Sequence, residues 1–130
     1  MAEADRDRGA VQRAGLAAAH RALVIALPVL VLIQAAIAGQ YLFEGASITV
    51  HGILGTVSFV VTVALVALAA TRRRSGLQFA VAVALAAMTF AQVGLGYVGR
   101  DSTAAASWHI PLGVAIFGLA CYQLALATRD

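Results

Sequence analysis

The chain has 130 residues, of which 62% are hydrophobic, and a net charge of +3 at pH 7. An ordinary soluble domain is only about 45–50% apolar, so this composition indicates a membrane protein. The length allows one domain with about four spans of roughly 20 residues. Nucleic-acid binding is excluded because eight of the nine arginines flank apolar runs. The single cysteine, Cys121, excludes a disulfide framework or a thiolate metal cluster within one chain.

Four apolar runs without Asp, Glu, Lys or Arg follow a polar N-terminal segment. The segment covers residues 1–21, and the predicted membrane domain 22–130 has spans at about 22–43, 48–70, 77–98 and 108–128. Backbone polar groups cannot stay unpaired in lipid, and each run is about twice as long as a barrel strand, so each span is predicted to be an α-helix. The expected fold class is therefore all-α, an integral membrane four-helix bundle.

The first run has an alternative interpretation as a cleaved signal peptide. Basic residues precede it, and Ala36-Ile37-Ala38 has the small-x-small form of a cleavage site. However, the apolar run continues through Leu42 and Phe43, further than a typical signal core. We therefore expect a membrane span.

The arginines predict the orientation of the bundle. Eight of the nine lie at the end that holds both termini and the loop between the second and third spans, whereas Arg100 lies at the other end. By the positive-inside rule both termini are cytoplasmic, in a multi-pass protein of the plasma membrane. Glu44 and residues 100–107 then face outward. The aromatic residues that would form an interfacial belt there are Tyr41, Phe43, Tyr97 and Trp108.

The two halves of the chain form an internal repeat with an offset of 58 residues. This offset superimposes Gln34 on Gln92 and His51 on His109, with a 17-residue interval in each half. Each repeat is a predicted helical hairpin, so the bundle is built from two tandem hairpins related by an axis along the membrane normal. We therefore expect the two histidines at equal depth near the outer end, facing each other across the axis.

Two neutral imidazoles that face each other inside a bundle are natural axial ligands of a haem iron. His51 and His109 are therefore the candidate metal ligands, and haem b is the candidate cofactor. Each histidine is expected to open its helix, where the positive end of the helix dipole disfavours an imidazolium.

The rest of the repeated pattern, His-x-x-Leu-Gly-x-x-x-Phe, suits a haem pocket. Gly55 and Gly113 lie one turn deeper than the histidines and would let a porphyrin approach each helix. Phe59 and Phe117 lie two turns deeper and would close an apolar floor. Arg100, the single outer cation, either lies among lipid headgroups or pairs with the haem propionates.

Two alternatives to a haem site remain open at this point. A histidine at the outer end of a membrane helix is often only an interfacial residue. A zinc site would need a third or fourth ligand, for which only Glu44 and Asp101 are near in the sequence.

The other polar residues of the spans are expected to have structural roles. His20, whose counterpart in the repeat is Gln78, is expected at the cytoplasmic interface. Gln34 and Gln92 are expected to form hydrogen bonds between helices. Pro111 is expected in the first turn of the last helix, where no backbone donor is needed.

The sequence resembles one four-helix half of haem A synthase over about residues 30–126. The resemblance is carried by the two histidines that open the second and fourth spans, and by Gln92-Val93-Gly94-Leu95-Gly96 leading to Trp108-His109. It implies that His51 and His109 bind a b-type haem, as in the half of that family that holds a cofactor and does no substrate chemistry.

The chain departs from the substrate-side half of that family. That half has a Glu three residues before its first ligand histidine and an Arg just after it, where this chain has Ile48 and Gly52. The outer-loop cysteine pair found in many members is also absent. Haem A synthase activity is therefore not expected.

The leading functional hypothesis is a membrane haem protein that passes single electrons. Its expected partners are the lipid bilayer and either a quinol or a redox partner protein, and the sequence leaves a homodimer open. One alternative is a non-redox protein that holds, senses or hands on haem. Another is an accessory or assembly subunit without a cofactor, in which the repeat serves packing alone.

The predicted orientation can be tested by cysteine labelling of intact cells in a variant that lacks Cys121. A cysteine introduced at Asp101 should react with a membrane-impermeant reagent from outside, whereas one at Arg73 should not, because the arginine-rich loop is predicted to be cytoplasmic. Labelling at position 73 without labelling at position 101 would show that the orientation is inverted.

Overall fold

The computed structural model describes residues 1–45, 47–71 and 76–129, without the side chains of Ala2 and Glu3. Within these ranges the chain forms four α-helices: α1 (Ala2–Glu44), α2 (Thr49–Thr71), α3 (Gly76–Val98) and α4 (Thr103–Ala127). The predicted all-α four-helix fold is confirmed. The arginines at positions 72–74 and Asp130, which contributed to the predicted orientation, lie outside the described residues.

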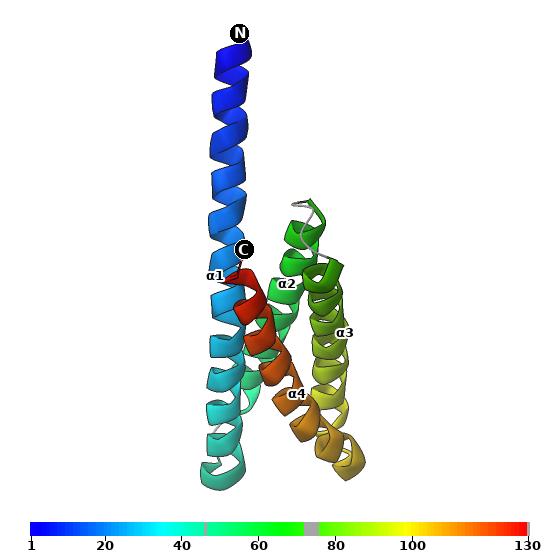
Figure 1. Cartoon of the computed structure of the whole chain (residues 1–130). Helices are drawn as coiled ribbons and strands as arrows, with labels where there is room; N and C mark the ends of the chain where they lie inside the picture. The colour runs from blue at the N-terminus through cyan, green and yellow to red at the C-terminus, as the bar shows by residue number, and fades with distance from the viewer. Residues whose placement is uncertain (46, 72–75, 130) are drawn as a thin grey trace.

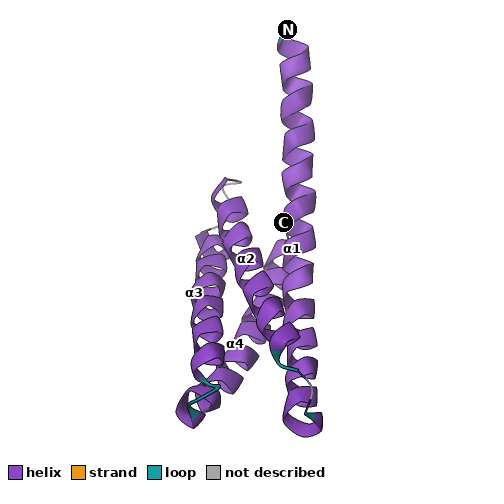
Figure 2. Ribbon diagram, turned by 180° about the vertical axis from the view of Figure 1, so that it is seen from behind, coloured by secondary structure: helices purple, strands orange, loops and turns teal. Residues whose placement is uncertain are grey.

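The four helices form a ring in which each helix packs against two others (Figure 1). α2 packs against α1 and α3, and α4 packs against α3 and α1. In the described part of the chain the backbones of α2 and α4 do not pack against each other, so these two helices occupy opposite corners of the ring. The turns α1–α2 and α3–α4 both lie at one end, here called the connector end (Figure 2). The chain termini lie toward the other end, here called the terminal end.

Helix α1 is much longer than the span predicted within it. It has 43 residues, which corresponds to about 64 Å at the usual rise per residue. Its first turns rise beyond the rest of the bundle (Figure 1). The predicted N-terminal segment 1–21 is therefore continuous with the first span, as its many alanines and arginines favour. The helix ends at Gly45, which has φ 70° and donates its N–H to Gln40 O, a left-handed cap that favours glycine.

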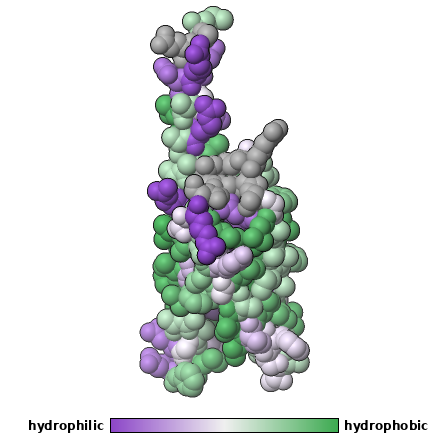
Figure 3. Space-filling view, viewed as in Figure 1, coloured by the Kyte–Doolittle hydropathy of each residue, from purple (hydrophilic) through white to green (hydrophobic). Residues whose placement is uncertain are grey.

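All four helices are long and apolar enough to cross a membrane. On the face shown in Figure 3, apolar side chains cover the middle of the bundle, and polar side chains gather on the projecting part of α1 and toward the ends. Large apolar residues such as Leu32, Val60, Phe90 and Val114 are exposed. Exposed surface of this kind is suited to lipid, so the chain is a multi-pass membrane protein.

The densest packing lies in the half of the bundle toward the terminal end. Every helix contributes to its core, which includes Val24, Leu27, Leu65, Ala69, Val81, Ala82, Leu85, Ile116 and Ala120. The hydroxyls of Thr62 and Thr89 join α2 to α3 across 2.9 Å in this buried region. Because lipid offers no competing partner, such bonds between helices contribute to the association of the spans.

The structure corrects the expectation that His20 is an interfacial residue. His20 is only 1% exposed, and Gln78 and Gln123 are buried equally deeply. Gln78 Nε2 donates to Leu126 O at 3.1 Å, and Gln123 Nε2 donates to Gln78 O at 3.3 Å. The position next to Arg21 suggested a side chain at the membrane surface, but His20 lies on the face of α1 that is buried in the bundle.

Helix α4 begins at Thr103, five residues before the predicted start at 108. Ser102 caps it by accepting a hydrogen bond from the Ala105 N–H at 3.3 Å, and the alanines that follow favour helix. His109 therefore lies in the second turn, so the expected influence of the helix dipole applies to His51 alone. The expectation for Pro111 is also wrong, because it lies inside the helix and removes a backbone donor there.

Gly99 permits the tight turn between α3 and α4. A Cβ at this position would lie 2.8 Å from Leu95 O and 3.2 Å from Ala106 N, which are backbone atoms. We expect Gly99→Ala to lower the free energy of unfolding by about 1–3 kcal/mol, because the backbone must move to relieve these contacts. Unfolding by denaturing detergent would measure this cost. Gly94→Ala is the matched control, since nothing lies within 4 Å of its Cβ position, and an equal loss in both variants would contradict the assignment.

Candidate functional site

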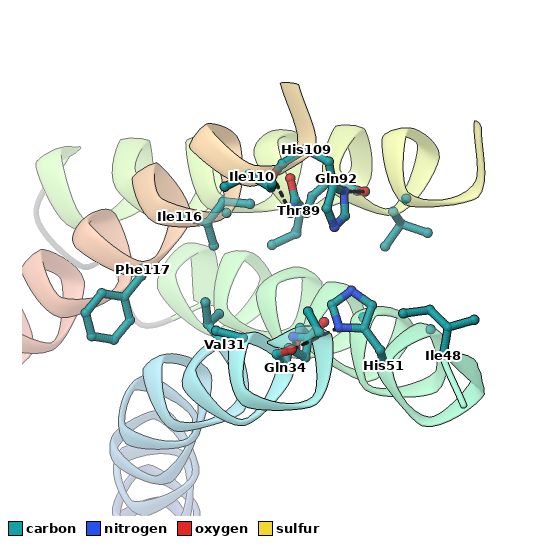
Figure 4. Close-up of a pocket in the computed structure, with 18 of the residues that line it drawn as sticks. Val31, Gln34, Ile48, His51, Thr89, Gln92, His109, Ile110, Ile116 and Phe117 are labelled. Carbon is teal, nitrogen blue, oxygen red and sulfur yellow. Dashed lines mark hydrogen bonds between the residues drawn. The ribbon is translucent and has the colours of Figure 1, made fainter. Parts of the chain in front are cut away.

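The imidazoles of His51 and His109 face each other inside the bundle near the connector end (Figure 4). His51 extends from α2 and His109 from α4, the two helices at opposite corners of the ring. Their ring centroids are 5.9 Å apart, and the ring planes are inclined by 60°. The structure therefore brings together the two side chains that the repeat placed at equal depth.

Each imidazole is oriented by the same hydrogen bond within its own hairpin. His51 Nδ1 lies 3.0 Å from Gln34 O, and His109 Nδ1 lies 3.0 Å from Gln92 O. A carbonyl oxygen only accepts, so Nδ1 must carry the proton and donate it. In the neutral ring Nε2 then keeps its lone pair, which is the arrangement found around metal-binding histidines.

The glutamine side chains add a second contact in each hairpin. Gln34 Nε2 donates to Ser58 Oγ at 2.9 Å, and Gln92 Nε2 donates to His109 O at 2.9 Å. The expected hydrogen bonds between helices are thus present in both halves. The contact that sequence reasoning missed is the backbone one, in which the carbonyl 17 residues upstream holds each imidazole. The repeated interval of 17 residues was its only signal in the sequence.

A cavity of about 460 Å³ adjoins the two histidines and is lined by all four helices. Its volume is within the range of sites for small molecules and cofactors. The predicted site residues that line it, besides the histidines, are Gly55, Gly113, Phe117 and Arg100. Its walls are mainly apolar, and they also include Ile48.

Phe59 does not line this cavity, unlike its counterpart Phe117. Its ring packs against Phe90 of α3, with 5.8 Å between the centroids. Phe90 has Leu32 as its counterpart in the repeat, so the matching aromatic contact cannot form between α1 and α4. The two phenylalanines that the motif predicts as equivalent therefore have different surroundings.

The glycines of the motif make room for the glutamines. A Cβ on Gly113 would lie 3.0 Å from Gln92 Nε2, and one on Gly55 would lie 3.4 Å from Gln34 Oε1. The glycine that contacts an imidazole is Gly96 of α3, where a Cβ would lie 3.0 Å from His109 Cε1. We expected the first two glycines to admit a porphyrin. Gly55 and Gly113 line the cavity, but the side chains nearest to them are those of Gln34 and Gln92.

Arg100 lies at the connector end of the cavity. Its guanidinium lies 4.9 Å from the centre of the Tyr97 ring, and its Nη2 would be 3.7 Å from a Cβ on Gly52. Among the described residues the one ion pair is the exposed contact between Asp5 and Arg8. Arg100 therefore has no carboxylate partner in that part of the chain. An anionic group at this end of the cavity would therefore meet an available cation.

The residues present do not form a zinc site of the usual kind. Among the described residues, no group of three or more His, Cys, Asp and Glu side chains is close enough to share a metal ion. Glu44 and Asp101, the two acidic candidates considered above, do not line the cavity. The two imidazoles supply two nitrogen ligands, so a metal ion held between them would need its other ligands from elsewhere.

The contact between Gly96 and His109 gives a test of the site geometry. We expect Gly96→Ala to displace the His109 imidazole by a few tenths of an ångström and to change the NMR signal of its Nδ1–H, because the new Cβ would lie 3.0 Å from Cε1. The signal of His51 should stay unchanged. Gly94→Ala is again the control, and equal changes at His109 in both variants would contradict the proposed contact.

Comparisons of the chain with protein families, curated proteins and solved structures give no match. The resemblance to one half of haem A synthase therefore remains a prediction from the motifs described above. Any proposal about function depends on the histidines, the cavity and the surrounding side chains of this chain.

Proposed function

We propose that this protein binds one b-type haem within its four-helix bundle, with His51 and His109 as the two axial ligands. The observation that supports this most directly is the duplicated hydrogen bond from Nδ1 to a glutamine carbonyl. It leaves the Nε2 of each ring available as a ligand, on two rings that face each other across one cavity. The proposal makes the chain a membrane haem protein.

The dimensions of the site suit one iron between two imidazoles. A metal ion lies about 2 Å from an imidazole nitrogen, and that nitrogen lies about 1 Å from the centroid of its ring. Two imidazoles on one ion would therefore have centroids about 6 Å apart. The observed separation is 5.9 Å. The apolar walls would accommodate a macrocycle, and Arg100 would pair with a carboxylate at the connector end.

Bound in this way, a haem iron with two histidine ligands supplies one-electron transfer and has no open position for oxygen chemistry. The residues that line the cavity do not favour chemistry on a bound substrate. Ile48 lines the cavity at the position where the resembled family has a glutamate in its substrate-side half, so no acid or base is available there. Electron transfer is therefore the activity that we propose.

Electron transfer and simple haem holding can be separated by two measurements on the purified protein. A redox titration would give the midpoint potential, and stopped-flow mixing with a quinol would show whether the haem is reduced in the membrane. Reduction by quinol on the timescale of seconds or faster supports electron transfer. A haem that no quinol reduces favours a protein that holds or hands on haem.

The ligand assignment predicts about one haem b per chain with a low-spin spectrum. Pyridine haemochrome analysis measures the stoichiometry, and its failure to detect haem after reconstitution would favour the cofactor-free alternative. We expect His51→Gly and His109→Gly each to lose haem or become high-spin, because one strong-field ligand is removed. Added imidazole should restore the low-spin spectrum, since it can occupy the vacated ligand position.

His20→Gln is the matched control for these variants. It replaces the third histidine with the residue type found at the equivalent position, Gln78. His20 does not line the cavity that adjoins the other two histidines, so the spectrum and haem content should be unchanged. A high-spin spectrum for His20→Gln, with normal spectra for the other two variants, would contradict the assignment.

A further inference from the structure

The repeat relates two of the contacts between neighbouring helices of the ring, and each such contact is here called a seam. An offset of 58 residues carries α1 onto α3 and α2 onto α4, so the seam between α2 and α3 corresponds to the seam between α4 and α1. Two equivalent seams would be equally closed. The two seams differ in this structure. The contact between α2 and α3 is the most extensive in the ring, and the contact between α1 and α4 is the least extensive.

Bulky side chains close the α2–α3 seam beside the cavity. Phe59 packs on Phe90, and Arg100 lies over Tyr97 and close to Gly52. Gly52, Tyr97 and Arg100 border both the cavity and a separate groove on the outside of this seam. These residues therefore form the wall between the histidines and the surroundings on this side.

The counterparts of these residues leave the α1–α4 seam open. Tyr97 corresponds to Gly39 and Arg100 corresponds to Leu42, so a glycine and an aliphatic residue replace the ring and the guanidinium. α1 and α4 approach each other near the C-terminus and diverge toward the connector end, as both views show (Figures 1 and 2). The divergence coincides with the half of the bundle that contains the cavity.

The cavity extends into this opening. Leu42 of α1 and Val114 of α4 line the cavity, yet they are 63% and 69% exposed. Ile110 and Leu32 are likewise both lining and exposed. Lining residues that also face outward mark where the cavity meets its surroundings. On the α1–α4 side these four are aliphatic, whereas on the α2–α3 side they are Tyr97, which is 53% exposed, and Arg100. In a membrane the opening between α1 and α4 faces the lipid chains.

We propose that the α1–α4 seam is a lateral port through which haem moves between the lipid phase and the histidine pair. This inference depends on the proposed function and adds a route of exchange to it. The apolar rim fits a macrocycle dissolved in the membrane, and Arg100 at the connector end of the cavity complements its carboxylates. A phospholipid acyl chain would also match the rim, but it would make no use of the histidines or of the arginine.

The test narrows the port without changing the ligands. Gly39 lines the cavity on this side and has nothing within 4 Å of its Cβ position, so the first atom of a side chain can be added there without a clash. Gly39→Tyr copies the counterpart residue of the closed seam, and Gly39→Trp is larger. Gly94→Trp is the control, because it adds the same side chain at an equally open position that does not line the cavity.

Each full-length variant is reconstituted without haem into vesicles and mixed with donor vesicles that contain haem. The growth of the Soret band gives the uptake rate, and transfer to an excess of apomyoglobin gives the release rate. We expect Gly39→Trp to slow both uptake and release by about tenfold, because it raises a barrier that haem crosses in either direction. Gly39→Tyr should slow both rates less.

Three outcomes would contradict the proposal that haem moves through the α1–α4 seam. One is a rate unchanged by both Gly39 variants, and another is an equal slowing by Gly94→Trp. The third is faster release with weaker affinity in Gly39→Trp, which would place Gly39 in the binding site and not on the route. A wild-type chain that takes up no haem from vesicles or from water contradicts the proposed function itself, so the two failures are distinguishable.

Discussion

The hydrogen bond from each histidine to the glutamine carbonyl of its own hairpin is the interaction on which the site depends. Hydrocarbon offers no alternative partner to an imidazole N–H, so the bond is retained within the protein. It joins the second helix of each hairpin to the first and engages Nδ1, so Nε2 takes no part in this bond. Because the bond occurs in both halves, the two rings meet across the cavity at 5.9 Å.

The two ends of the bundle differ in how closely their side chains pack. Toward the terminal end, Leu27, Leu65, Leu85 and Ile116 pack into a closed core. Toward the connector end, the glycines and the small residues of α1 leave a cavity of about 460 Å³. Close packing in one half stabilises the ring, so the other half can stay open without loss of the fold.

Duplication explains the paired histidines, and divergence between the copies explains why the two helix contacts that flank them differ. The copies agree where a histidine must be held, at Gln34 with His51 and at Gln92 with His109. They differ along the seams, where Tyr97 and Arg100 of one copy correspond to Gly39 and Leu42 of the other. A bundle with two identical seams would be either closed or open on both sides. In this chain the contact between α2 and α3 is more extensive than that between α1 and α4.

Some features of the fold and site follow from local properties of the sequence. The four spans follow from runs of apolar residues without charges, since hydrocarbon admits only helices or closed barrels. The equal depth of His51 and His109 follows from the offset of 58 residues, since equal spacing within equal hairpins gives equal height. The helix boundaries were predicted less well where caps and alanine-rich stretches, and not hydropathy, decide the ends. The clearest cases are Thr103 in α4 and the continuous α1.

The tertiary structure alone decided the features that depend on contacts between helices. The backbone carbonyls that hold the imidazoles carry no side-chain signature, so the sequence could not name them as partners. The burial of His20, the separate surroundings of Phe59 and Phe117, and the contact of Gly96 with His109 all depend on which neighbour each face meets. The open seam between α1 and α4 has the same origin. A repeat specifies which residues are equivalent, but only packing determines how far apart two helices come to lie.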